Sequence, residues 1–101
     1  MSEPIPFETK MAALRAHFTK RARHEGVQLR AFADQVGSDS DARNGIDKIA
    51  HGLAGAAAIF GMPHVSTAAA RLEEAVASGA ADADIVRQTL SLAESLTRLA
   101  T

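Results

Sequence analysis

The sequence predicts an all-α protein, an up-down-up-down antiparallel four-helix bundle. Alanine, the best helix former, is abundant, and apolar residues recur at about 100° per residue in four segments. No segment alternates polar and apolar residues with the period of two that is typical of a β-strand. Because the links between the four segments are short, we expect consecutive helices to be antiparallel neighbours.

The first expected helix, residues 7–36, is the longest. Glu25 falls within its apolar stripe, and Gly26 weakens a helix by about 1 kcal/mol relative to alanine, so we expect a kink there. We expect the Phe and Met residues of the stripe to lie in the core. The stripe consists of Phe7, Met11, Leu14, Phe18, Ala22, Leu29, Phe32, Ala33 and Val36.

Three shorter helices follow, and turn or capping residues mark their boundaries. We expect these helices at residues 41–60, 63–78 and 82–100. Ser40 or Asp41 can accept hydrogen bonds from the free amides of the first, and Asp82 or Asp84 can do so for the last. Glycine follows the first two of them, as it commonly does at helix ends. The whole chain, residues 1–101, therefore forms one domain.

The composition excludes several classes of site and partner. With no cysteine, the chain has no disulfide and no thiolate metal site, which suits a cytoplasmic protein. No run of about 18 apolar residues is present, so we expect no membrane span. A net charge of −1 and 4% aromatic residues argue against nucleic-acid binding. His17 and His24 are seven residues apart, which does not favour metal binding, and we expect no metal or cofactor.

His51 is the main candidate for chemistry. On a helical wheel it lies about 150° from the centre of the apolar stripe of the second helix, so its imidazole should face solvent. The residues that share or flank this outer face are Asn44, Asp47, Lys48, Ala54, Gly55 and Ala58.

The turn beyond His51 is almost bare of side chains. A solvent-facing helix normally carries charged or polar residues, but here it carries Ala54, Gly55 and Ala58. Glycine is costly in mid-helix, and one physical use for Gly55 is to let another protein approach closely. Ile59 lies near the edge of this face and can add an apolar docking contact.

An exposed imidazole has two distinct nitrogens, one of which can attack a phosphoryl group while the other holds the ring. Lys48, one turn before His51, can supply positive charge near the phosphoryl oxygens. The chain has no glycine-rich phosphate loop and no evident carboxylate set for magnesium. A phosphoryl group on His51 would therefore come from another protein and not from ATP bound by this chain.

These residues resemble a known family. The stretch His51-Gly52-Leu53-Ala54-Gly55, preceded by Ile49-Ala50 and followed by Phe60-Gly61, resembles the motif of the histidine-containing phosphotransfer (HPt) domain. Ala69, Leu72 and Glu73 resemble the stretch that the family has on its next helix. The likeness covers roughly residues 41–74, and the bundle plan covers almost the whole chain.

The resemblance implies a phosphocarrier in a two-component phosphorelay. His51 would carry the phosphate on Nε2, and Gly55 would leave the imidazole accessible. The partners would be the receiver domain of a response regulator, with its phosphorylatable aspartate, and a hybrid sensor histidine kinase. The family's common lysine three residues after the histidine is replaced by Ala54, and our hypothesis is that Lys48 partly replaces its charge.

Two alternatives stay open. A helical scaffold that docks a signalling partner without chemistry would have the same bundle, although such a protein would not need His51. The basic run Lys20, Arg21, Arg23 and His24 is either a solvated face or a patch for an acidic receiver surface. We expect a monomer, because four helices already close a bundle.

Overall fold

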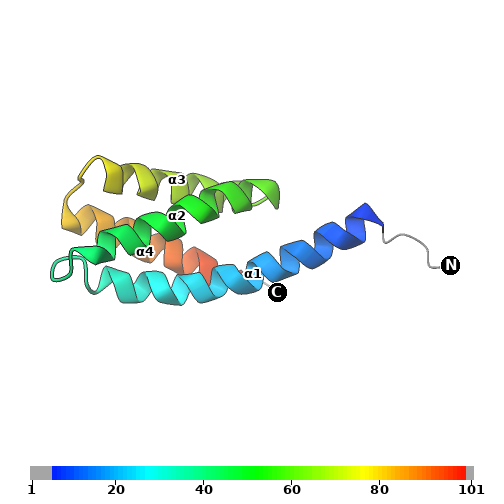
Figure 1. The fold of residues 1–101 in the computed structure, drawn as a ribbon, viewed down its shortest axis with the longest axis horizontal. Helices are drawn as coiled ribbons and strands as arrows, with labels where there is room; N and C mark the ends of the chain where they lie inside the picture. The colour runs from blue at the N-terminus through cyan, green and yellow to red at the C-terminus, as the bar shows by residue number, and fades with distance from the viewer. Residues whose placement is uncertain (1–5, 100–101) are drawn as a thin grey trace.

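The computed structural model describes residues 6–99, which form four helices and no strand (Figure 1). The helices are α1 (Phe7–Ala33), α2 (Asp41–Ile59), α3 (Pro63–Ala77) and α4 (Asp82–Thr97). Each runs opposite to the one before it, and the four pack in a ring in which α1 also lies beside α4. The predicted all-α four-helix bundle is confirmed. Within residues 6–99, no helix combines the length and apolar character needed to cross a membrane.

Small side chains let the helices approach closely. Alanines from all four helices are fully buried between larger aliphatic side chains. At Gly26 a helix backbone approaches another helix closely, since a Cβ there would lie 3.1 Å from both the Ala93 carbonyl oxygen and the Leu96 Cβ. α1 is one continuous helix through Gly26, and Figure 1 shows that it bends along its length. The kink at Gly26 itself stays a prediction. The glycine lets α1 pack directly on the backbone of α4.

Glycine ends α2 and α3, as the sequence predicts. Gly61 and Gly79 have φ values of 72° and 71°, a left-handed conformation that side chains disfavour. Beyond each glycine, an amide reaches back five residues: the Met62 N–H donates to the Ala57 carbonyl at 2.8 Å, and the Ala80 N–H reaches Ala75 at 3.0 Å. These bonds satisfy carbonyl groups that would otherwise be unpaired at the helix ends.

The helix starts differ from the prediction. Neither Ser40 nor Asp41 caps α2; the Asp41 N–H instead donates to Asp39 Oδ1 at 2.9 Å. No side chain caps α4, because Asp82 lies within its first turn and accepts a 2.7 Å hydrogen bond from Arg43. The helices also end one to three residues earlier than expected: α1 ends at Ala33 because residues 34–38 form turns.

α1 extends past the other helices at its N-terminal end (Figure 1). Its 27 residues span about 40 Å, whereas the 15 residues of α3 span about 22 Å. From Phe18 the apolar stripe of α1 enters the core, but Phe7 is 74% exposed and Leu14 is 53% exposed. The expectation that the Phe and Met residues of the stripe lie in the core is therefore wrong for Phe7 and for the half-buried Met11, because the bundle does not reach that far.

Glu25 is a partly buried charge on α1. Its side chain is 17% exposed and pairs with Arg21 Nε at 3.2 Å, but Oε2 is buried without a hydrogen-bond partner in the described structure. Burial raises the pKa of the Glu25 carboxyl, and this effect outweighs the opposing influence of Arg21 and His24. The ionised carboxylate therefore lowers the stability of the fold.

We predict that Glu25→Gln raises the free energy of unfolding at pH 7. The native carboxyl has the higher pKa, so its charge costs stability above that pKa, and the cost disappears as the pH falls through it. The gain over wild type should therefore shrink towards pH 4, as measured by urea unfolding across the pH range. Glu94→Gln, which removes a half-exposed partner of Arg98, is the control and should change little. A less stable Glu25→Gln variant at pH 7 would contradict this assignment.

We predict that Gly79→Ala lowers the free energy of unfolding by about 1–2 kcal/mol, because alanine disfavours the positive φ of this position. Gly52→Ala is the matched control. Gly52 lies within α2, and a Cβ there would meet no atom within 4 Å. Alanine at that position should stabilise the protein by about 0.5–1 kcal/mol. Chemical denaturation measures both, and changes of the same sign would contradict the prediction.

Candidate functional site

His51 lies in the middle of α2 and points away from the core. Its neighbours Ala50 and Leu53 are fully buried, whereas the His51 side chain is 78% exposed. The helical phase that buries Ala50 and Leu53 turns His51 outward, as the wheel predicts. The imidazole is therefore open to a reaction partner while its backbone is held in the bundle.

Glu73 of α3 holds one nitrogen of the imidazole ring. Its Oε2 lies 2.5 Å from His51 Nδ1, and its side chain is 32% exposed. An ionised carboxylate can only accept a hydrogen bond, so Nδ1 carries the proton and donates it. In a neutral ring, Nε2 then has a free lone pair. The contact fixes both the orientation of the ring and the tautomer in which Nε2 is the nucleophile.

The surface beyond His51 is open. A Cβ on Gly52 or on Gly55 would meet no atom within 4 Å, so neither glycine is required by packing within the described structure. Of the predicted docking residues, Ala58 is exposed, Ile59 is 70% exposed and Ala54 is half-buried. Together these residues leave a smooth, low surface on the C-terminal side of the histidine.

Ala54 is half-buried because α3 covers it. Ser66 Oγ of α3 donates a 2.7 Å hydrogen bond to the Ala54 carbonyl oxygen, so the two helices are tied together one turn beyond His51. This bond and the buried alanines between α2 and α3 bring Glu73 within reach of the imidazole.

The predicted supporting residues lie on the N-terminal side of His51. Asn44 and Lys48 are exposed, and Asp47 is half-buried. In the described part of the chain, none of the three makes a side-chain hydrogen bond or ion pair. Lys48 is therefore free to turn towards a group on His51, one helical turn away.

Glu73 is the residue that the sequence did not single out for the site. It appears in the stretch that resembles the HPt family, but no role follows from its place in the sequence, 22 residues after His51. One signal was available: Leu72 lies on the apolar stripe of α3, which puts the next residue at the edge of the buried face. The sequence does not show which neighbouring helix lies beside that edge, because this depends on how the helices pack.

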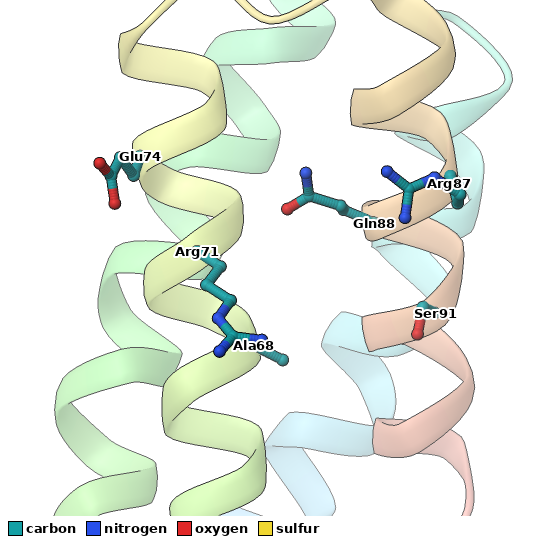
Figure 2. A pocket seen from close by; sticks show the side chains of 6 residues that line it. All are labelled: Ala68, Arg71, Glu74, Arg87, Gln88 and Ser91. Atoms are coloured by element: carbon teal, nitrogen blue, oxygen red, sulfur yellow. The ribbon is translucent and has the colours of Figure 1, made fainter.

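A second, separate groove lies between α3 and α4. It has a volume of about 450 Å³ and contains none of the predicted site residues. Figure 2 shows Gln88 extending from α4 towards α3, while Arg71 runs along α3 and Glu74 points away from α4. Its lining residues are Ala68, Arg71, Glu74, Arg87, Gln88 and Ser91. Among residues 6–99, no group of three His, Cys, Asp or Glu side chains could hold a metal ion.

Comparison with known proteins identifies the family. The family model for the Hpt domain matches residues 11–101, nearly the whole chain. No curated protein and no solved structure matches the chain. The matched region contains His51, its Glu73 partner and the open surface around them. The chain belongs to the Hpt domain family.

Proposed function

We propose that this protein relays a phosphoryl group between receiver-domain aspartates in a two-component phosphorelay, with phospho-His51 as the intermediate. Membership of the Hpt family supports a role in histidine phosphotransfer. The observation that carries the proposal for His51 is its geometry: Nδ1 donates to Glu73, and the ring is mostly exposed. No other histidine in residues 6–99 has a carboxylate partner.

In the transfer step, the bonds form and break between His51 and the donor, and Glu73 supports the ring. The lone pair of Nε2 attacks the phosphorus of an aspartyl phosphate, the N–P bond forms, and the P–O bond to the aspartate breaks, so a carboxylate leaves. The imidazole becomes a cation whose Nδ1–H still donates to Glu73, and the negative carboxylate stabilises that charge. The reverse sequence passes the phosphoryl group to the aspartate of the next receiver.

The open surface allows the in-line approach that this step requires. A receiver must bring its aspartate to within about 3–3.5 Å of Nε2, and bulky side chains next to His51 would prevent this. Gly52 and Gly55 leave that space free. We assign docking of the receiver to Ala54, Ala58 and Ile59, and we propose a hybrid sensor histidine kinase as the upstream source of phosphate.

Lys48 is the cation that we assign to the phosphoryl oxygens. Ala54 occupies the position at which the family commonly has a lysine, so the usual charge is missing on the C-terminal side of His51. Lys48 lies three residues before His51 and is exposed, so its flexible side chain can approach the phosphoryl group from the other side. Asn44 and Asp47 lie on the same side and are assigned supporting roles.

We predict that Glu73→Gln slows phosphotransfer in both directions by about 10- to 100-fold, because a hydrogen bond to a charged group contributes about 1.5–3 kcal/mol. The measurement is the rate at which acid-labile, base-stable phosphate appears on the chain after addition of a phosphorylated receiver. His51→Gln should abolish that phosphate and change the free energy of unfolding by no more than about 0.5 kcal/mol.

Glu74→Gln is the matched control, since Glu74 is the next residue on α3 and is exposed, and its side chain makes no hydrogen bond or ion pair in the described structure. Its transfer rate should equal that of wild type. If receivers from the same source bind the chain but leave no phosphate on His51, the protein is a docking scaffold and the proposal fails.

We predict that Lys48→Ala slows transfer about two- to fivefold in both directions, as expected for one exposed cation near a charged group. Lys10→Ala removes an exposed lysine on α1 outside the basic run and should leave the rate unchanged. The loss should be smaller at high salt, because ions screen exposed charges. If Lys48→Ala transfers phosphate as fast as wild type in both directions, Lys48 does not stabilise the phosphoryl group and this hypothesis fails.

A further inference from the structure

The N-terminal part of α1 has an apolar side without a partner in the described structure. This segment, residues 7–17, is called here the α1 overhang, and it extends beyond the end of the bundle (Figure 1). Phe7 is 74% exposed and Leu14 is 53% exposed, values that are unusual for large apolar residues aligned on one side of a helix. The overhang therefore exposes a continuation of the core stripe.

The spacing along this stripe is that of a coiled coil. Phe7, Met11, Leu14 and Phe18 are separated by four, three and four residues, which is the alternation of the two seam positions in a heptad. Phe18 is buried in the chain's own bundle, where its ring stacks on Phe60 with centroids 5.3 Å apart. The seam thus begins in the core and continues into solvent for about two helical turns.

We propose that the α1 overhang pairs with the same segment of a second copy, as an antiparallel two-stranded coiled coil that makes the protein a homodimer. The position of the bundle favours the antiparallel orientation. Because the seam enters a bundle at Phe18, a parallel pair would bring both bundles to the same end of the coil, where they would collide. An antiparallel pair puts them at opposite ends.

The charges beside the seam favour the same orientation. In a parallel pair, flanking residues five positions apart face each other across the seam, so Lys10 would oppose Arg15. In an antiparallel pair, the residues that directly follow Phe7 and Leu14 lie on the same flank of the seam, and those of one copy face those of the other. Glu8 follows Phe7 and Arg15 follows Leu14, so Glu8 of each copy would oppose Arg15 of the other. The attraction occurs twice because the pair is symmetric.

The length of the overhang fits this register. With the two-fold axis between Ala12 and Ala13, Met11 packs on the partner's Leu14. The partner's Phe7 then reaches the level of Phe18, where the bundle begins. At this end of the bundle lies an apolar groove of about 410 Å³ formed by the α2–α3 turn, the start of α3 and the end of α4.

Arg15 already lies at this end of the bundle. Its Nη2 atom is 3.7 Å from the position that a Cβ on Gly61 would occupy, so the guanidinium covers the α2–α3 turn. The partner's Glu8 would arrive beside it. The sequence predicts a monomer because four helices close a bundle, but the overhang lies outside that bundle and leaves the closure intact.

The proposed interface is separate from the phosphotransfer site. His51 lies eight residues, or about 12 Å, before the end of α2, on a helix that ends where the overhang begins. Dimerisation would leave both His51 side chains exposed. The inference does not depend on the proposed function, and its failure would leave the assignment of His51 unaffected.

Sedimentation equilibrium at low salt tests the dimer and its orientation. Wild type should associate to twice the 10.6 kDa of one chain. Glu8→Arg and Arg15→Glu should each weaken association about tenfold or more, and the double variant should restore it, because the swap recreates both attractions. Leu14→Asp should abolish association, with unchanged helix content by circular dichroism. Arg23→Glu makes the same change of charge at an exposed residue of α1 outside the overhang, and it is the control.

The outcomes distinguish the possibilities. A mass of 10.6 kDa at millimolar concentration would overturn the proposal. Stronger association of Arg15→Glu would indicate a parallel coil, in which Lys10 would attract the new Glu, and would overturn the antiparallel pairing. Binding of the wild-type chain to anionic lipid vesicles without self-association would show that the overhang contacts a membrane surface and not a second copy.

Discussion

The close packing of α2 against α3 is the constraint on which the site depends. Ala50 and Ala57 of α2 and Ala69 of α3 are fully buried, and Ser66 of α3 donates to the Ala54 carbonyl. At this separation, a glutamate on α3 reaches an imidazole on α2. Larger residues at the buried alanine positions would move the helices apart, since a close-packed core has little room for added volume. The imidazole would then lose its acceptor even though every residue of the site was retained.

The surface around His51 is open to other molecules because it carries glycines that lower the stability of the helix. Gly52 and Gly55 lie within α2, where each is less favourable than alanine by roughly 0.5–1 kcal/mol, and neither is needed for packing in the described structure. The same helix buries Ile46, Leu53 and Ala57 completely, and this burial offsets the cost. Gly52 and Gly55 thus break a local rule of helix design on the face around His51, and such departures are common at functional sites.

Periodicity predicts those features that one helix determines by itself. The exposure of His51 and the helix ends at Gly61 and Gly79 follow from phase and from backbone preference, and both agree with the structure. Features that need two helices do not follow from periodicity. The acceptor for His51 Nδ1 lies on another helix, and the close contact of Gly26 with the backbone of α4 also depends on a second helix. Apolar spacing also cannot show that the bundle ends near Phe18.

Gly26 has a wider consequence for how the molecule is divided. It lets α1 lie directly on α4, while buried alanines join α2 to α3, so the bundle consists of two tightly packed helix pairs. His51 and Glu73 both belong to the second pair, and the exposed apolar segment of α1 belongs to the first. Evolution can therefore alter the exposed end of one pair without disturbing the chemistry of the other. In this architecture, paralogues could diverge in assembly while sharing an unchanged face around His51.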